Sequence, residues 1–383
     1  MQDKSDSSFE PDRPLSIFAY AYTSAVGIAI LLFGPIIIGV YIEVEGMTEM
    51  QAGYLFSLEM AGYAFSSAIV FAIITRVNWR YILLAGVFIA VLSNITSIYL
   101  HDYDELLKIR FLAGLGAGLL MNITIVSIGL TSNFDRNYGF WVVMQLTVGA
   151  AGLYLLPGLI PGYGLAAPFL IVTILALLIL PLVNSFQRYG RTAGDTPGKT
   201  NRLFLGLTGL LGIFIYYAGQ AAVWAYFERM GTDVGIDPDS VGSILSASLV
   251  LGIFGAALAT WLGDRRGRRL PIAASMICSA IGISFLWGMQ SVYPYIIAAF
   301  LFNAAWYFCL PFLSAIIANI DTNGRLLVGL SVVFPSSLAA GPALATYVLN
   351  DAGYSPVLWI GMLSLPTGLI IMWKVAGRNS TCP

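Results

Sequence analysis

The chain alternates between long apolar stretches and short polar segments. Every apolar stretch has at least 18 residues, which is enough for a helix to cross a hydrocarbon core of roughly 30 Å. The pattern therefore predicts twelve membrane-spanning helices, with ends placed to within a few residues. They cover residues 15–42, 51–75, 80–100, 106–131, 138–162, 165–187, 203–228, 239–262, 270–290, 292–318, 326–350 and 355–377.

One polar segment divides the predicted helices into two sets of six. Residues 188–202 are rich in Gly, Thr and basic side chains, as expected of a linker. A shift of 188 residues takes the start of the first helix to that of the seventh, and Arg76 to Asp264, which indicates a repeat. We therefore predict an all-α polytopic membrane protein with twelve transmembrane helices in two pseudo-symmetric six-helix bundles. Its parts are a cytosolic tail (1–14), a first bundle (15–187), the linker (188–202), a second bundle (203–377) and a cytosolic tail (378–383).

The composition agrees with a membrane protein and excludes a soluble enzyme. Hydrophobic residues make up 58% of the 383 and charged residues 10%, whereas soluble domains carry about 25% charged residues. With the N-terminus in the cytoplasm, sixteen of the nineteen Lys and Arg fall on the cytoplasmic side. This bias predicts a multi-pass protein of the plasma (inner) membrane with both termini cytoplasmic. The net charge of −1 hides that asymmetry and indicates no nucleic-acid partner.

A short basic turn joins the eighth and ninth predicted helices. It runs from Leu262 to Arg269 and holds four arginines in six residues, which is too polar for hydrocarbon. We expect Gly267 to take a positive φ there. The turn resembles the loop signature of the major facilitator superfamily, G-x-L-a-D-R-x-G-R-R, with Thr260 at the first glycine. The matching residues are Asp264, Arg265, Gly267, Arg268 and Arg269.

The resemblance implies a secondary transporter, whose two six-helix halves rock about a central site. It also implies that Asp264 and its basic neighbours form a gate on the cytoplasmic side, which is remade as the halves move. The equivalent turn of the first half, residues 75–80, lacks the aspartate and the glycine. Asp264 is therefore expected to carry more of the gate.

The fourth predicted helix carries a second pattern that resembles this family, R-x-x-x-G-x-G-x-G. Arg110, Gly114, Gly118 and Asn122 recur every four residues and so share one face. Small residues on such a face let another helix approach closely. An arginine inside the bilayer is costly and marks function or a partner. The alternative is that Arg110 extends to the outer headgroups.

The second predicted helix supplies a counter-charge for Arg110. Glu59 lies well inside an otherwise apolar span. Burial favours the protonated carboxyl, whereas a nearby Arg110 favours the carboxylate. A group balanced between these effects is suited to proton coupling, so we expect Glu59 and Arg110 to couple transport to protons. The alternatives are a static ion pair and a carboxyl that reaches the outer surface.

Aromatic and amide side chains at helical spacing mark the expected solute site. In the resembled family, helices one, four, seven and ten line the central cavity. Buried amides need a partner, and an aromatic lining with few charges suits an amphipathic or aromatic-compatible organic solute. The alternative is helix packing or an interface belt, and Tyr217, Phe227 and Glu228 lie on the same stripe. The expected cavity residues are Tyr20, Ser24, Asn122, Tyr216, Gln220, Trp224, Asn303, Trp306 and Tyr307.

We therefore predict a transporter that moves a small organic solute by alternating access, coupled to protons and surrounded by membrane lipids. We expect a monomer with no cofactor. We also expect no metal, because the three cysteines show no metal-ligand spacing. An intramembrane enzyme such as a lipid-modifying transferase is disfavoured, because the only histidine, His101, lies in an outer loop. Two alternatives stay open: a drug or metabolite exporter working by proton antiport, and a non-transporting receptor on the same scaffold.

Overall fold

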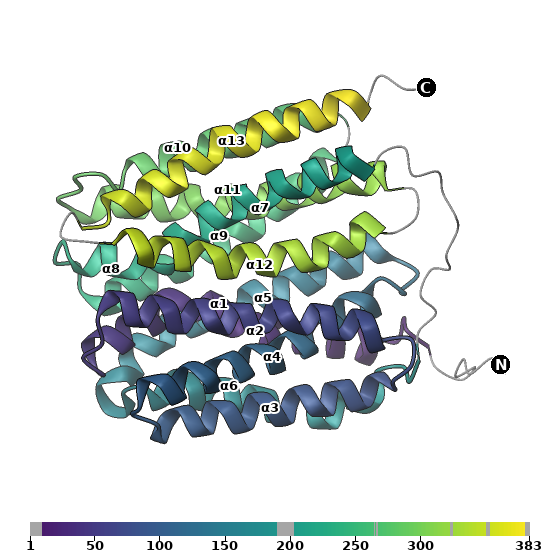
Figure 1. Cartoon of the computed structure of the whole chain (residues 1–383), viewed down its shortest axis with the longest axis horizontal. Coiled ribbons are helices and arrows are strands. Elements are labelled where there is room, and N and C mark those ends of the chain that lie inside the picture. The colour runs from purple at the N-terminus through teal and green to yellow at the C-terminus, as the bar shows by residue number, and fades with distance from the viewer. Residues whose placement is uncertain are drawn as a thin grey trace.

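The structure is a computed structural model, and it describes residues 10–189, 203–263, 265, 267–321, 325–349 and 353–379. Long helices lie side by side along one direction (Figure 1). The helices of the described residues, long and short, are α1 (Pro14–Glu43), α2 (Glu49–Ile73), α3 (Trp79–Tyr99), α4 (Tyr103–Ile128), α5 (Phe134–Tyr163), α6 (Ala166–Leu177), α7 (Leu203–Ala225), α8 (Phe227–Thr232), α9 (Pro238–Leu262), α10 (Arg269–Ser284), α11 (Val292–Ile320), α12 (Arg325–Val348) and α13 (Ser355–Asn379), with one 3-10 helix, η1 (Leu180–Ser185).

Each of the twelve predicted spans coincides with a helix of the described chain, so the prediction of an all-α polytopic protein is confirmed. Ten of the helices described are long and apolar enough to cross a membrane, and the two shorter apolar ones are α6 and α10. α6 ends at Leu177 instead of near residue 187, and η1 follows it. Pro181 has no N–H with which to continue the α-helical hydrogen bonds to the carbonyl of Leu177, where α6 ends.

The seventh predicted span is interrupted near its end. α7 stops at Ala225, and Tyr226 leaves helical geometry with φ −106° and ψ 12°. The chain then forms the short α8, and Gly235 follows with φ +84°, a conformation that favours glycine. The interruption lets α8 pack against both α1 and α9.

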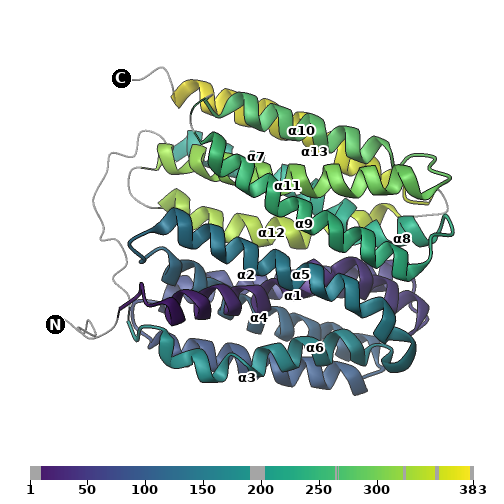
Figure 2. The same cartoon turned by 180° about the vertical axis from the view of Figure 1, so that it is seen from behind.

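The chain folds into two halves that lie one above the other in Figures 1 and 2. In the first half α2 packs on α4 and α1 packs on α5, while in the second half α9 packs on α11 and α7 packs on α12. Counted from the start of each half, these are equivalent pairs of spans. Between the halves, α2 packs on α12 and α5 packs on α9, which are again equivalent. The repeat predicted from the sequence is therefore visible in the packing.

The bundle has two ends, which we name by residues of α1. At the Pro14 end α1 begins and α13 finishes, and at the Glu43 end α1 finishes and α2 begins (Figure 1). Of the spans described, α1 is the most deeply buried, with 89% of its most apolar window inside the protein. Such a helix has no face for lipid, which fits its contacts with helices of both halves.

An amide–hydroxyl contact recurs at equivalent places in the two halves. Asn122 of α4 donates through Nδ2 to the hydroxyls of Ser66 and Ser67 in α2, each at 3.1 Å. Asn303 of α11 donates through Nδ2 to the hydroxyl of Ser248 in α9 at 2.8 Å. Asn303 and Ser248 lie 181 residues after Asn122 and Ser67, respectively. The same polar contact therefore joins the second and fourth spans of each half.

Glycines bring α2 and α4 into backbone contact. A Cβ added to Gly114 would lie 1.7 Å from the main-chain oxygen of Glu59, and one added to Gly62 would lie 2.0 Å from that of Phe111. Neither position accepts a side chain unless the helices separate. The small-residue face predicted for the fourth span is confirmed as a packing surface.

Candidate functional site

A buried ion pair joins α2 and α4. Arg110 is 0% exposed and Glu59 is 3% exposed. The Nε of Arg110 donates to Oε2 of Glu59 at 3.2 Å, and Nη2 donates to Oε1. A two-point contact of this kind fixes both the distance and the relative plane of the two groups. The two residues that the sequence predicts as partners therefore meet, and Arg110 does not extend to the surface.

Arg110 makes further contacts with other helices of the first half. Its Nη1 donates to Oδ1 of Asn94 at 3.0 Å and to the hydroxyl of Ser97 at 3.2 Å, both in α3. The guanidinium also lies over the ring of Phe169 in α6, 4.4 Å from the centroid. A buried guanidinium is stable only where such partners replace water. The ion pair therefore lies in the interior of the first half, among α2, α3, α4 and α6.

Aromatic rings form a continuous cluster in the second half. Tyr217 of α7 contacts Trp306 of α11 at 5.2 Å between ring centroids, and Phe334 of α12 at 4.7 Å. Trp306 contacts Phe302 at 5.9 Å, and Phe302 stacks with Trp224 at 6.4 Å. We name these five residues the aromatic cluster. Among the described residues, the buried hydroxyl of Tyr217 has no hydrogen-bond partner, so the cluster holds a polar group that a ligand could satisfy.

The residues expected to line the solute cavity do not all face one place. Trp224 and Trp306 belong to the aromatic cluster, whereas Asn122 and Asn303 bind serines of the neighbouring helix in their own half. Gln220 accepts a hydrogen bond from the hydroxyl of Ser279 in α10 at 2.6 Å. The other four expected residues also contact their own half. Tyr307 lies beside Gly252 of α9, and Tyr216 lies beside Gly368 of α13. The ring of Tyr20 contacts that of Phe186, and the hydroxyl of Ser24 donates to the carbonyl of Ala21.

Three members of the aromatic cluster are not among the expected cavity residues: Tyr217, which lies on the predicted stripe, Phe302 and Phe334. Phe302 lies four residues before Trp306, a spacing that places both on one helix face and could have indicated it. Phe334 left no such signal, because its contact with Tyr217 joins two helices far apart in the sequence.

Polar contacts join the two halves at the Glu43 end. We name this set the Glu43-end closure. Its pairs are Trp224–Leu31, Tyr226–Glu49, Arg229–Glu43 and Tyr354–Glu49. The indole Nε1 of Trp224 lies 3.1 Å from the main-chain oxygen of Leu31, and the Tyr226 hydroxyl lies 3.1 Å from that of Glu49. The halves are therefore held together at this end by side chains of α7, α8 and the start of α13.

The basic turn lies at the Pro14 end and is described in part. Asp264 and Arg266 lie outside the described residues. Gly267 has φ +65°, as predicted from the sequence. Gly263 also has a positive φ, of 48°. The chain therefore reverses direction between α9 and α10 with a glycine on each side of Asp264.

Arginines of this turn anchor the start of α10 on its own half. Arg268 donates to a main-chain carbonyl of α11, and Arg269 lies over the ring of Trp373 in α13, 5.3 Å from the centroid. The first half has a similar anchor. Arg80 at the start of α3 donates through Nε to the carbonyl of Phe186, which follows η1, at 2.7 Å. The third span of each half is thus tied to the end of the sixth.

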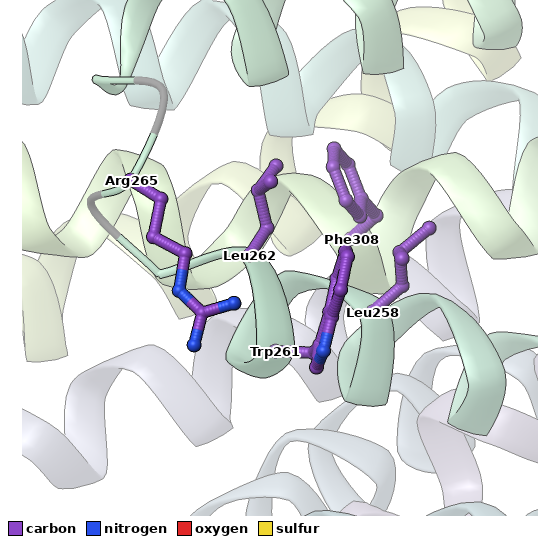
Figure 3. A pocket seen from close by; sticks show the side chains of 5 residues that line it. All are labelled: Leu258, Trp261, Leu262, Arg265 and Phe308. Carbon is purple, nitrogen blue, oxygen red and sulfur yellow. The ribbon is translucent and has the colours of Figure 1, made fainter.

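One pocket lies beside the turn, between α9 and α11 (Figure 3). Its lining is Leu258, Trp261, Leu262, Arg265 and Phe308. The guanidinium of Arg265 lies 5.7 Å from the centroid of the Trp261 ring. Apart from the arginine this lining is apolar, so the pocket lacks the hydroxyls and amides that orient a polar solute.

A sequence model of the Major Facilitator Superfamily matches residues 209–380, within the second half. The match covers 172 of the 383 residues, so the second half of the chain is similar to this superfamily. The crystal structure of a D-xylose-proton symporter is similar, with a TM-score of 0.70 and 16% identity over 94% of this chain and 95% of that one. The crystal structure of a mutant of the nucleoside transporter NupG has a TM-score of 0.69 and 10% identity over 94% and 99%. At such identities the two structures show the shared fold alone.

The family match and the fold agree with the predicted class of the protein. The matched model is that of a transporter superfamily, and both similar structures are transporters. These findings agree with the prediction of a multi-pass membrane transporter that is not an enzyme. The two solved structures match nearly the whole chain. The transporter fold therefore includes the first half, which lies outside the region matched by the sequence model.

Proposed function

We propose that this protein moves a small polar solute of the sugar or nucleoside class by alternating access, coupled to protons. Two solved structures with its fold are a D-xylose-proton symporter and a nucleoside transporter. The observation that carries the proposal is the aromatic cluster, whose rings adjoin the buried, unpaired hydroxyl of Tyr217. Sugar rings and nucleobases pack on aromatic faces, and both solutes bring hydroxyls that can pair with such a group.

The aromatic cluster carries no formal charge, which narrows the solute class. A strongly charged metabolite would need a counter-charge, because an unpaired buried charge is very unfavourable. A neutral solute with several hydroxyls needs only hydrogen-bond partners and a ring to pack on. Trp306 and Tyr217 together offer both, since their rings are in contact.

Proton coupling is assigned in this proposal to Glu59, with Arg110 as the group that modulates it. Protonation of Glu59 would remove its charge and weaken the ion pair. Arg110 would keep Asn94, Ser97 and the ring of Phe169 as partners. The pair can therefore open without leaving a bare buried charge, which would be strongly destabilising.

Alternating access follows from the arrangement of the closure and the basic turn. In the proposed orientation the Pro14 end faces the cytoplasm of the inner membrane, and the Glu43 end faces outside. The structure then corresponds to a monomer that is closed on the outside by the Glu43-end closure. Asp264 and its neighbours would gate the cytoplasmic side when the halves rock the other way.

The test is solute flux and internal pH in proteoliposomes that contain the full-length protein. Radiolabelled pentoses, hexoses and nucleosides are offered one class at a time, while an enclosed dye reports proton movement. We expect uptake of one class with acidification of the interior. In Glu59→Gln the acidification should be lost while solute exchange continues. Tyr217→Phe should raise the KM for the solute about tenfold, because one hydrogen bond is lost.

Other outcomes would change specific parts of the proposal. Equal flux without any pH change in wild type and Glu59→Gln would make the ion pair structural and the protein a uniporter. Solute leaving as protons enter would identify an exporter that works by antiport. Binding without flux would identify a receptor, and no binding of any of the three solute types would overturn the solute class.

A further inference from the structure

Glu228 of α8 lies where the two halves touch at the Glu43 end. The residue is 5% exposed. A Cβ added to Gly39 of α1 would lie 2.5 Å from Oε2 of Glu228 and 2.9 Å from its Cδ. The carboxyl therefore packs directly on the backbone of the other half, in space that only glycine leaves free. Its Oε2 has no hydrogen-bond partner in the part of the chain that the structure describes.

The charged groups around Glu228 do not neutralise it. Arg229, its neighbour in the chain, pairs with Glu43 of α1 and with Asp233, which directly follows α8. Tyr295 of α11 donates its hydroxyl to a main-chain carbonyl of α8. Burial, opposed by Arg229 and aided by Glu43 and Asp233, raises the pKa of the Glu228 carboxyl to about 8. A carboxyl in this setting is most stable as the neutral acid.

We propose that Glu228 is a second proton-binding site, which holds a proton while α8 packs on α1 and releases it to the outside when the halves separate there. The inference rests on the proposed alternating access and adds a site distinct from Glu59. The only bond that breaks is the carboxyl O–H. The proton passes to water at the Glu43 end, and a carboxylate remains.

The proposal fixes the sign of the pH dependence. In the closed state the pKa of Glu228 is raised, and in the open state hydration returns it toward the ordinary glutamate value of about 4.3. Closing the Glu43 end therefore binds a proton at any pH between those two values. Over that range each rise of one pH unit lowers the ratio of closed to open molecules up to about tenfold. Above about pH 8 both states are ionised and the effect ends.

The test measures the width of the Glu43 end in the full-length protein in lipid nanodiscs, without solute. Cys278, Cys309 and Cys382 are replaced by serine, and spin labels are attached through Met50→Cys in α2 and Asp239→Cys in α9, both exposed at this end. Between about pH 6 and about pH 8, the ratio of closed to open molecules in the wild-type background should fall about 50-fold, measured as growth of the longer distance.

The variants show whether the pH response comes from the Glu228 carboxyl or from other groups at this end. Glu228→Gln keeps the shape of the neutral acid and cannot ionise, so its distances should stay short at every pH. Glu45→Gln, a matched change at the same end of the bundle, should keep the wild-type response. Gly39→Ala should displace the carboxyl toward water and move the midpoint to lower pH. The same pH response in Glu228→Gln as in wild type would overturn the proposal, as would wild-type distances that do not change with pH.

The outcome is separable from that of the proposed function. Absence of sugar and nucleoside flux, with a pH response that Glu228→Gln abolishes, would reject the proposed solute and leave the proton site standing. Proton-coupled flux that depends on Glu59, together with label distances that are the same in Glu228→Gln and wild type at every pH, would reject only the second site.

Discussion

The indole Nε1 of Trp224 in α7 donates a hydrogen bond to the main-chain oxygen of Leu31 in α1, 3.1 Å away. That oxygen is available because Pro35, one turn later, has no N–H to pair with it. Trp224 thus supplies from the second half the donor that a proline removed from the first. If the halves separate at this end, the contact is broken. It therefore stabilises the closed state and not the open state.

Replacing Trp224 by phenylalanine should therefore favour the open state. The ring is kept in the aromatic cluster, but the Leu31 oxygen loses its partner. A loss of about 1 kcal/mol lowers the ratio of closed to open molecules about fivefold. The distance between labels at positions 50 and 239 would report it, as growth of the longer component at constant pH.

The reason given for this effect can be tested with Pro35→Ala. The alanine restores an N–H that can pair with the Leu31 oxygen, so Trp224→Phe should have a smaller effect in that background. Trp359→Phe, at a tryptophan that is 54% exposed, is the matched control and should leave the distances unchanged. Equal effects of Trp224→Phe with and without Pro35 would contradict the assignment.

The repeated amide–hydroxyl contact leads to a second prediction. Asn122→Ala and Asn303→Ala should each lower the free energy of unfolding by about 1 kcal/mol, because each removes the amide that bonds serine hydroxyls of the neighbouring helix. Ser66 and Ser248 keep hydrogen bonds to their own helices, to the carbonyls of Tyr63 at 2.6 Å and Leu245 at 2.7 Å. The loss should therefore stay moderate. SDS-induced unfolding of the purified protein in mixed micelles measures both values.

A double-mutant cycle checks that the contact itself is responsible. Asn303→Ala and Ser248→Ala together should cost less than the sum of the two single changes, with a coupling of at least about 0.5 kcal/mol. Ser336→Ala is a suitable control, since its hydroxyl donates to the carbonyl of Val332 in its own helix. Strict additivity of the Asn303 and Ser248 changes would show that the two side chains act independently.

Most of the fold could be predicted from the sequence because lipid restricts the choices. Every backbone group in hydrocarbon must pair internally, so a long apolar stretch becomes a helix. The changes at Pro181 and Tyr226 were harder to predict. The proline is a local sequence signal for the first change. At Tyr226 no proline or glycine indicates that α7 ends there.

The ion pair of the candidate site could be predicted, because a charged side chain in an apolar span has few stable environments. Glu59 and Arg110 lie in apolar spans, and two such groups are stable when they pair. Helical spacing also grouped Asn122 with Arg110 correctly on one face, and that face meets α2. The spacing could not show which helix covers a face. For that reason the bond from Ser279 to Gln220 and the contact of Phe334 with Tyr217 needed the structure.

Two glycines of the first half allow a direct test of the α2–α4 contact. In Gly114→Ala the new methyl would meet the Glu59 main-chain oxygen, so the helices must separate. We expect a loss of at least about 2 kcal/mol in SDS-induced unfolding, and weaker proton coupling, because the separation also moves Glu59 from Arg110. Gly139→Ala in α5 has nothing within 4 Å of its added Cβ and should change stability by no more than about 1 kcal/mol. Equal losses in the two variants would mean that the contact between α2 and α4 does not account for the glycine at position 114.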